Sequence, residues 1–288
     1  MSVVKDFETE HFPTWCPGCG NFGIWVSMKQ AIVNLGYAPH ELVLVFGVGC
    51  SGNMSNFINV YGFHGLHGRP VPVAEGIRAA NSGIKVLATG GDGDGYGEGL
   101  GHFIHTMRGN WDMTYVVHNN QVYGLTTGQT SPTSMKGFQT KSTPSGVVEV
   151  PVNPLALAIT SGATFVARGF AGDAKHLTSL IEQGMRHKGF SFIDVLQPCV
   201  TFNRLNTYQW FTERVYKLEE KEGYDPKNKM MALEKTFEDW NKNIPTGVFY
   251  LEDKPSYEDN FAQLSKGPLV KNRVDTQLDV SPLMEDFR

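Results

Sequence analysis

Residues 91–129 read GDGDGYGEGLGHFIHTMRGNWDMTYVVHNNQVYGLTTGQ and are the most informative part of the sequence for the fold. An apolar, β-rich run precedes it at residues 84–88, and a second such run lies within it at residues 113–117. The residues between the two runs are compatible with a helix, so the order predicts a strand–helix–strand unit with parallel strands. Asp92 and Asn120 then follow the two strands, at the edge where open α/β sheets bind ligands.

The side chains expected at this edge suit a magnesium ion on a diphosphate. Mg²⁺ prefers about six oxygen ligands and usually takes one or two carboxylates together with substrate phosphates. Asp92 supplies a charged oxygen and Asn120 a neutral one, and a main-chain carbonyl at residue 121 or 122 completes the protein's share. Three glycines leave main-chain N–H groups open to the phosphates, and the N-terminus of the next helix favours an anion. They are Gly91, Gly93 and Gly95.

Other readings of the stretch are less specific. Gly, Asp and Asn dominate turns, so the alternative is a glycine-rich turn with a capping aspartate, followed by an Asn-Asn turn. The glycines do not have the G-x-G-x-x-G spacing of a dinucleotide site, and the chain contains no P-loop motif. The spacing and the position at strand ends favour the magnesium hypothesis.

Length and composition indicate a globular protein. The chain has 288 residues, of which 41% are hydrophobic and 19% are charged, enough for one large or two small domains. The net charge of −4 and the lack of a basic run argue against nucleic acid as a partner. No apolar run approaches the ~20 residues that span a bilayer, so no membrane partner is expected. The acidic, polar residues 1–12 do not resemble a signal or transit peptide, which favours a cytoplasmic location.

Strand-like and helix-like segments alternate along most of the chain. This alternation predicts an α/β fold with a doubly wound, mostly parallel sheet. We expect one domain over residues 1–200 and a C-terminal extension over residues 201–288 that packs on this domain or on a partner subunit. In the extension, an amphipathic helix is expected over residues 230–240. Its apolar stripe would be Met231, Leu233, Phe237 and Trp240.

The chain has four cysteines, Cys16, Cys19, Cys50 and Cys199. The first two form a C-x-x-C pair, and the other two follow expected strands and so lie at the ligand-binding edge. Four thiolates in one place suit Zn²⁺ or an iron–sulfur cluster, and their spacing does not decide between the two. A thioredoxin-like pair or plain buried cysteines are the alternatives, although the former explains neither Cys50 nor Cys199.

Several motifs within residues 12–208 resemble the β subunit of 2-oxoacid:ferredoxin oxidoreductases. These motifs are WCPGCGNFGI, GVGCSG, FHGLHGRPVPVAEGI, GDGDG, NNQVYGLTTGQTSPTS and QPCVTFNR. The resemblance implies thiamine diphosphate, Mg²⁺ and one [4Fe–4S] cluster in this chain. The cluster ligands would be Cys16, Cys19, Cys50 and Cys199. The magnesium ligands would be Asp92, Asn120 and the main-chain oxygen of Val122. The contacts to thiamine diphosphate would be Val48, Gly49, Cys50, Ser51, His67, Gly93, Asp94, Gly124 and Leu125.

The resemblance also implies a reaction and partners. The reaction would be the coenzyme A-dependent oxidative decarboxylation of a 2-oxoacid, with electrons passing through the cluster to ferredoxin. An α subunit, in a heterodimer or a dimer of heterodimers, would close the site and supply the acid that activates the thiamine. Two alternatives stay open: a non-oxidative thiamine diphosphate decarboxylase with a structural zinc site, and a non-catalytic zinc-binding α/β module.

Two further loops bear on the ligands. Thr127 stands where some members of the family that use 2-oxoglutarate carry a lysine, so it has no charge to pair with a distal carboxylate. This puts 2-oxoglutarate in doubt without excluding it, since a cation from the α subunit could substitute. Pyruvate, 2-oxobutyrate or a promiscuous preference stay open. His64, His67 and Arg69 form a cationic loop before an expected turn at residues 70–73. The loop either contacts the diphosphate or the substrate carboxylate, or is simply polar, and the resemblance favours a contact from His67.

Overall fold

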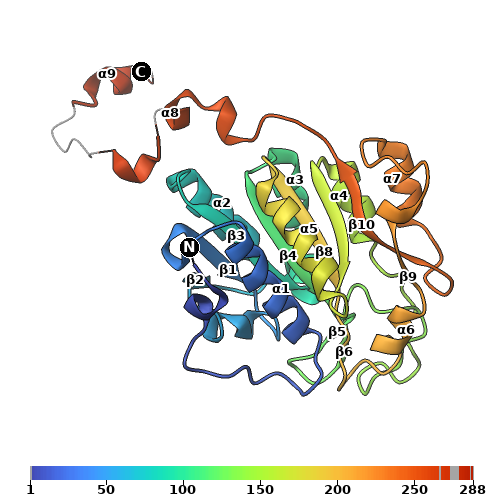
Figure 1. The fold of residues 1–288 in the computed structure, drawn as a ribbon. Coiled ribbons are helices and arrows are strands. Elements are labelled where there is room, and N and C mark those ends of the chain that lie inside the picture. Colours follow the sequence, from blue (N-terminus) through green and yellow to red (C-terminus); the bar gives the residue numbers. More distant parts are fainter. Residues whose placement is uncertain (1, 266, 273–278, 286, 288) are drawn as a thin grey trace.

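The computed structural model of the chain describes residues 2–265, 267–272, 279–285 and 287 (Figure 1). The α-helices are α1 (Asn21–Asn34), α2 (Pro70–Ala80), α3 (Leu100–Gly109), α4 (Pro154–Ser161), α5 (Ala174–Arg186), α6 (Tyr208–Thr212), α7 (Lys229–Thr236), α8 (Ala262–Ser265) and α9 (Ser281–Glu285). The strands are β1 (Leu42–Phe46), β2 (Tyr61–His64), β3 (Lys85–Gly91), β4 (Met113–Asn119), β5 (Val122–Tyr123), β6 (Gln129–Thr130), β7 (Phe165–Phe170), β8 (Phe190–Leu196), β9 (Val215–Lys217) and β10 (Ile244–Leu251).

One sheet of eight strands forms the centre of the molecule, in the order β2-β1-β3-β4-β8-β7-β10-β9. Neighbouring strands are parallel except for β10, which runs antiparallel to β7. The predicted doubly wound, mostly parallel α/β fold is therefore confirmed. Gly91 of β3 pairs with His118 of β4, which in turn pairs with Val195 of β8. This register places the ends of the three strands side by side at one edge, beside β5 and β6 in Figure 1.

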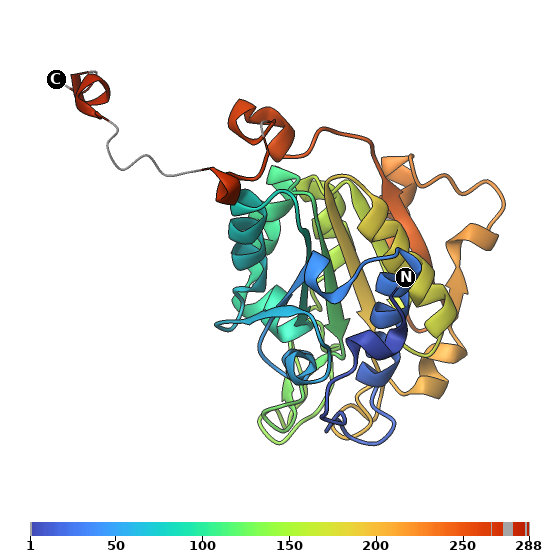
Figure 2. The ribbon, with the colours of Figure 1, turned by 60° about the vertical axis from the view of Figure 1, so that its left-hand side comes forward.

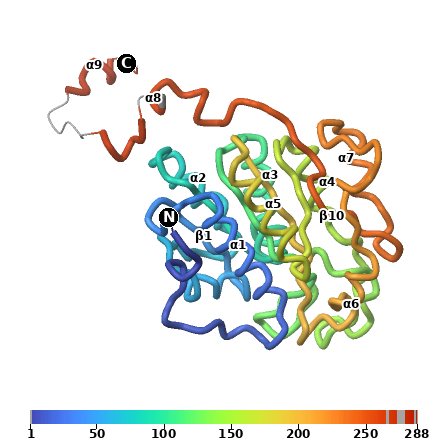
Figure 3. The backbone as a smooth tube through the Cα atoms, viewed as in Figure 1, coloured from blue at the N-terminus to red at the C-terminus, as the bar shows by residue number. Residues whose placement is uncertain are grey.

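Helices cover both faces of the sheet. On one face α1 packs beside α5, although the two helices are far apart in sequence (Figure 3). On the other face lie α2, α3, α4 and α7, and Figure 2 shows α2 and α1 on opposite sides of the sheet. In β1, Leu44 belongs to the core under α1 and α5, whereas Val45 belongs to the opposite core. A strand buried on both faces reads as a continuous apolar run, which is why the sequence shows such runs.

Part of the C-terminal extension continues the same sheet, through β9 and β10. The helix expected over residues 230–240 is shorter, because α7 ends at Thr236. Of the predicted apolar stripe, Leu233 and Trp240 pack against the core as partly buried residues, but Phe237 does not. The buried residues of α7 are Ala232 and Thr236, and the side chain of Phe237 is 70% exposed. The helix α7 packs against β10 and α4, and Phe237 lies just beyond its end.

One local expectation is also corrected. The segment expected to be a turn at residues 70–73 is the first turn of α2, which begins at Pro70. Proline suits the first position of a helix, because its fixed φ matches the helix and its missing N–H is not needed there. After Asp92, a π-helical segment (Gly93–Glu98) precedes α3. Among the described helices, none has the length and apolar character needed to cross a bilayer.

Candidate functional site

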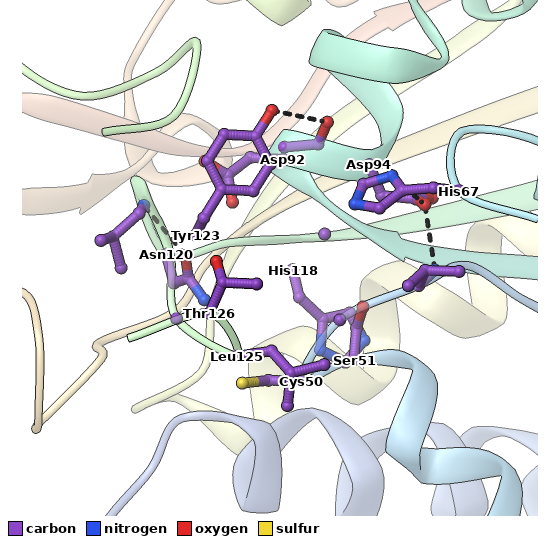
Figure 4. Close-up of a pocket in the computed structure, with 16 residues that line it drawn as sticks. Cys50, Ser51, His67, Asp92, Asp94, His118, Asn120, Tyr123, Leu125 and Thr126 are labelled. Atoms are coloured by element: carbon purple, nitrogen blue, oxygen red, sulfur yellow. Dashed lines mark hydrogen bonds and ion pairs between the residues drawn. The ribbon is translucent and has the colours of Figure 1, made fainter. Parts of the chain in front are cut away.

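A cavity of about 90 Å³ opens at the carboxyl edge of the sheet (Figure 4). Its wall comes from the segments that follow β1, β3 and β4, and from the histidine loop before α2. Gly95, which was expected to leave its N–H open to the phosphates, does not line the cavity, but every residue that the family resemblance assigns to thiamine diphosphate or Mg²⁺ does. They are Val48, Gly49, Cys50, Ser51, His67, Asp92, Gly93, Asp94, Asn120, Val122, Gly124 and Leu125. Their roles as ligands stay predictions.

The carboxylate of Asp92 is fixed by two hydroxyl groups. Asp92 Oδ2 accepts hydrogen bonds from Ser131 Oγ at 2.5 Å and from Thr133 Oγ1 at 2.6 Å. Burial raises the pKa of Asp92 to about 6, and these hydrogen bonds only partly oppose the rise. A divalent cation beside the carboxylate would favour its charged form, so the site suits a hard cation. Among the described residues, no three His, Cys, Asp or Glu side chains converge to hold a single metal ion.

A strained turn holds Asn120 and Val122. Asn120 Oδ1 accepts the Val122 N–H at 3.0 Å, and this oxygen keeps a second lone pair. Gln121 between them has a φ of 59°, in the left-handed region that non-glycine residues rarely adopt. Its Nε2 donates to Thr133 O at 3.1 Å, and its carbonyl accepts from Ser134 Oγ at 2.6 Å. Such a conformation persists where its surroundings hold it, and it is common at ligand sites.

Asp94 connects two loops of the cavity wall. Its Oδ1 accepts the main-chain N–H groups of Val48 at 2.9 Å and of Gly68 at 2.8 Å. His67 Nδ1 lies 3.1 Å from the same oxygen. Burial raises the pKa of Asp94, while these N–H groups and His67 oppose the rise. The turn after β1 and the histidine loop are thereby held in fixed positions around the cavity.

His118 lines the cavity but is absent from the predicted set. Its Nδ1 donates to Asn21 Oδ1 at 2.7 Å, and its Nε2 lies 2.9 Å from Thr89 Oγ1. Burial lowers the pKa of His118 to about 3, so the ring is neutral at physiological pH. The sequence feature that could have identified His118 as a site residue is its position at the end of an apolar strand. The hydroxyls behind Asp92 were missed as well, because they come from a separate segment after β6 that only folding places there.

The four cysteines lie together beside this cavity. Cys19 and Cys199 are buried, Cys50 is partly buried and Cys16 is exposed. Burial raises the pKa of Cys19 to about 12 and that of Cys50 to about 11, and repulsion from the other cysteines adds to both rises. Thiols this weakly acidic become thiolates when a cationic metal centre displaces their protons. The chemistry of these sulfurs suits the metal centre predicted from the sequence. That centre stays a prediction, because no three of these side chains converge on one ion position in the described residues.

Gly124 leaves space beside two of the sulfurs. A Cβ at this position would lie 3.5 Å from Cys50 Sγ and 3.7 Å from Cys199 Sγ. Gly124 and Cys50 also line the cavity. The cavity and the cysteine group therefore share a wall, and a group bound by the cysteines would be adjacent to a ligand in the cavity.

Two family models match successive parts of the chain. The C-terminal TPP binding domain of thiamine pyrophosphate enzymes matches residues 47–195, and the C-terminal region of the pyruvate ferredoxin oxidoreductase beta subunit matches residues 199–266. A 2-oxoacid:ferredoxin oxidoreductase subunit beta from Saccharolobus solfataricus is 48% identical over 87% of this chain and 86% of that relative. The 2-oxoglutarate synthase subunit KorB of Methanocaldococcus jannaschii is 34% identical over 91% of this chain and 96% of that relative.

The fold also matches a solved structure. This is a 2-oxoglutarate:ferredoxin oxidoreductase from Magnetococcus marinus with 2-oxoglutarate, coenzyme A and succinyl-CoA bound. It has a TM-score of 0.90 and 36% sequence identity, and the match covers 100% of this chain and 96% of that chain. The resemblance stated from the sequence motifs is thus confirmed over nearly the whole length. The chain belongs to the β subunits of the 2-oxoacid:ferredoxin oxidoreductases.

Proposed function

We propose that this chain holds thiamine diphosphate, Mg²⁺ and one [4Fe–4S] cluster in a coenzyme A-dependent 2-oxoacid:ferredoxin oxidoreductase. The observation that carries the proposal is the wall shared by the cavity and the cysteine group at Cys50 and Gly124. Ferredoxin accepts single electrons, so an electron carrier must lie next to the cofactor at which the 2-oxoacid reacts. The shared wall meets this requirement.

Four of the groups that line the cavity have a task in this proposal. When bound, thiamine diphosphate supplies the carbanion chemistry that releases CO₂ from a 2-oxoacid. Asp92, Asn120 and the main-chain oxygen of Val122 would hold the magnesium ion that neutralises its diphosphate. Ser51 Oγ lines the cavity and has no hydrogen-bond partner in the described part of the chain, so a ligand there would satisfy it.

The cysteines would provide the route for electrons. Cys16, Cys19, Cys50 and Cys199 would each ligate one iron of the cluster. Cys50 faces the cavity, whereas Cys16 is exposed at the surface. Electrons would therefore enter on the side of Cys50 and leave to ferredoxin on the side of Cys16.

The α subunit would close the cavity and complete the active site. The β subunit family implies such a partner, and the side chain of Leu125 at the cavity is 51% exposed. The acid that activates the thiamine would come from the α subunit. This chain alone should therefore bind its cofactors without turning over a 2-oxoacid.

The substrate we propose is a 2-oxoacid of the pyruvate or 2-oxoglutarate type. Thr127 is exposed and lies next to the cavity-lining Thr126, and it has no charge to pair with the distal carboxylate of 2-oxoglutarate. This favours pyruvate-like substrates. Thr127→Lys should raise kcat/KM for 2-oxoglutarate relative to pyruvate by up to about fivefold, because an exposed ion pair contributes at most about 1 kcal/mol. Thr127→Gln is the neutral control, and equal ratios in the two variants would contradict this role.

The decisive experiment is anaerobic purification of the enzyme with its α subunit, followed by iron, sulfide, zinc and thiamine analysis. We expect equal amounts of iron and sulfide, and binding of thiamine diphosphate that depends on Mg²⁺. Asp92→Asn should abolish that binding and leave the iron content unchanged, with the exposed Asp253→Asn as control. Zinc without sulfide would overturn the electron-transfer function and favour a non-oxidative decarboxylase.

A further inference from the structure

The segment that follows β8 places an amide against one of the cysteines. Gln197 Nε2 donates toward Cys19 Sγ at 3.2 Å, and both side chains are buried. The same nitrogen donates to Pro198 O at 3.3 Å. An amide nitrogen carries two hydrogens, so it can make both contacts at once.

The Pro198 carbonyl decides which way this amide faces. The opposite orientation would turn Gln197 Oε1 toward the Pro198 oxygen, and two acceptors would then repel each other. Packing restricts the side chain further. A Cβ on Gly20 would lie 2.7 Å from Gln197 Cγ and 3.0 Å from Pro198 Cδ, so the C-x-x-C loop rests directly on this segment. Gln197 N also donates to Asn119 O at 3.0 Å.

Cys19 is thus distinguished from the other three cysteines. Its sulfur meets the Gln197 amide and also the main-chain N–H of Asn21. In the described part of the chain, the sulfurs of Cys16, Cys50 and Cys199 accept no hydrogen bond from a side chain. Two N–H donors aimed at one sulfur stabilise negative charge on it, which suits a thiolate ligand better than a neutral thiol.

We propose that Gln197 is a positioning residue that raises the reduction potential of the cluster through Cys19. The inference rests on the proposed function, since it needs the cluster. Reduction of a cluster held by these cysteines would add one electron, supplied by the reacting cofactor, and would exchange no bond or proton with Gln197. The added negative charge is shared by the ligating sulfurs, so the N–H···S hydrogen bond is stronger in the reduced state than in the oxidised state. A stronger hydrogen bond to the reduced state makes the cluster easier to reduce.

The experiment uses the enzyme assembled with its α subunit and purified without oxygen. Gln197→Met keeps the length of the side chain and removes the donor, and Gln197→Glu replaces the amide with a carboxyl group. Gln183→Met, on the exposed side of α5, is the matched control. The readout is the midpoint potential of the cluster, followed by electron paramagnetic resonance during a redox titration.

We expect Gln197→Met to lower the ratio of reduced to oxidised cluster, at a fixed potential, by about threefold to tenfold. Tenfold corresponds to ~59 mV for a one-electron couple. Gln197→Glu should lower the ratio further, because a carboxylate repels the thiolate, and Gln183→Met should match the wild type.

The possible outcomes separate the two proposals. If Gln197 had a purely structural role, its substitution would lower the iron and sulfide content and leave the midpoint potential of the remaining clusters unchanged. That result overturns the inference. An unchanged midpoint in both Gln197 variants overturns it too. If the methionine variant does not assemble, the midpoint potential of the glutamate variant tests the inference, because the glutamate side chain has nearly the shape of glutamine. A wild-type enzyme without iron and sulfide would instead refute the proposed function.

Discussion

His118 donates through Nδ1 to Asn21 Oδ1 at 2.7 Å, and this hydrogen bond joins the cavity to the helix that begins beside the C-x-x-C pair. Both side chains are buried, with 1% and 0% of their surface exposed. Asn21 is the first residue of α1 and lies two positions after Cys19. The two candidate binding sites are therefore connected by a hydrogen bond as well as by a shared wall.

The buried His118 should make stability depend on pH. Its pKa is about 3 in the folded protein, against an ordinary value of 6.5, so the unfolded chain binds more protons between these pH values. The free energy of unfolding should be highest above pH 6.5 and fall as the pH drops, by about 2 kcal/mol at pH 5. Chemical denaturation at pH 5 and pH 7 measures this. His118→Asn should lose less stability between the two pH values than the wild type or the exposed His40→Asn control. Equal losses in all three proteins would show that another group is responsible.

The hydroxyls of Ser131 and Thr133 should matter for cofactor binding. They fix the Asp92 carboxylate through hydrogen bonds of 2.5 and 2.6 Å. Losing groups that orient a metal ligand commonly costs about 10–100-fold in affinity, so we expect a loss of that size in Mg²⁺-dependent binding of thiamine diphosphate. Isothermal titration of Ser131→Ala and Thr133→Val tests this, with the exposed Ser142→Ala as control. Wild-type affinity in both variants would mean that Asp92 needs no such support.

Gly124→Ala should separate folding from cluster binding. The added Cβ would be in ordinary contact with the sulfurs of Cys50 and Cys199, at 3.5 and 3.7 Å, so the protein without iron should fold as before. The same methyl group would occupy space that a cluster needs. We expect less iron and sulfide in the variant and an unchanged melting temperature of the iron-free protein. Gly101→Ala, at a position with open space around it, is the control. Normal iron content in Gly124→Ala would place the cluster elsewhere.

A buried ion pair supports the sheet behind the cavity. Arg168 Nε donates to Asp194 Oδ2 at 3.1 Å, and Asp194 Oδ1 accepts from Tyr96 Oη at 2.8 Å and from Asn119 Nδ2 at 3.0 Å. Arg168→Met should lower the free energy of unfolding by about 3–5 kcal/mol, because it leaves the carboxylate buried without a cation. Adding Asp194→Asn should recover much of the loss, since it removes the unpaired charge. Chemical denaturation measures both variants. A double variant no more stable than the single one would show that the cost is one of packing.

Several elements were predictable because their causes are local. Residues 190–196 form β8 as expected, since the run is apolar and long enough to be buried on both faces. Asp173 caps α5 by accepting the His176 N–H at 3.0 Å, as the position of an Asp before a helical pattern suggests. The helix expected over residues 230–240 exists but ends at Thr236, and it buries Ala232 and Thr236, because the face that a short helix buries depends on what it packs against.

The amino-acid sequence alone determined the alternation of strands and helices, the order of the motifs and hence the family. These features depend on residue types at fixed spacings along the chain. The positions of His118, Ser131, Thr133 and Gln197 could not be read in this way. Each of them acts on a residue distant in sequence, Asn21, Asp92 or Cys19, that the parallel sheet brings to the same edge. Folding also determined the direction of each pKa shift, because burial raises or lowers a pKa only where the packed sheet and helices exclude water.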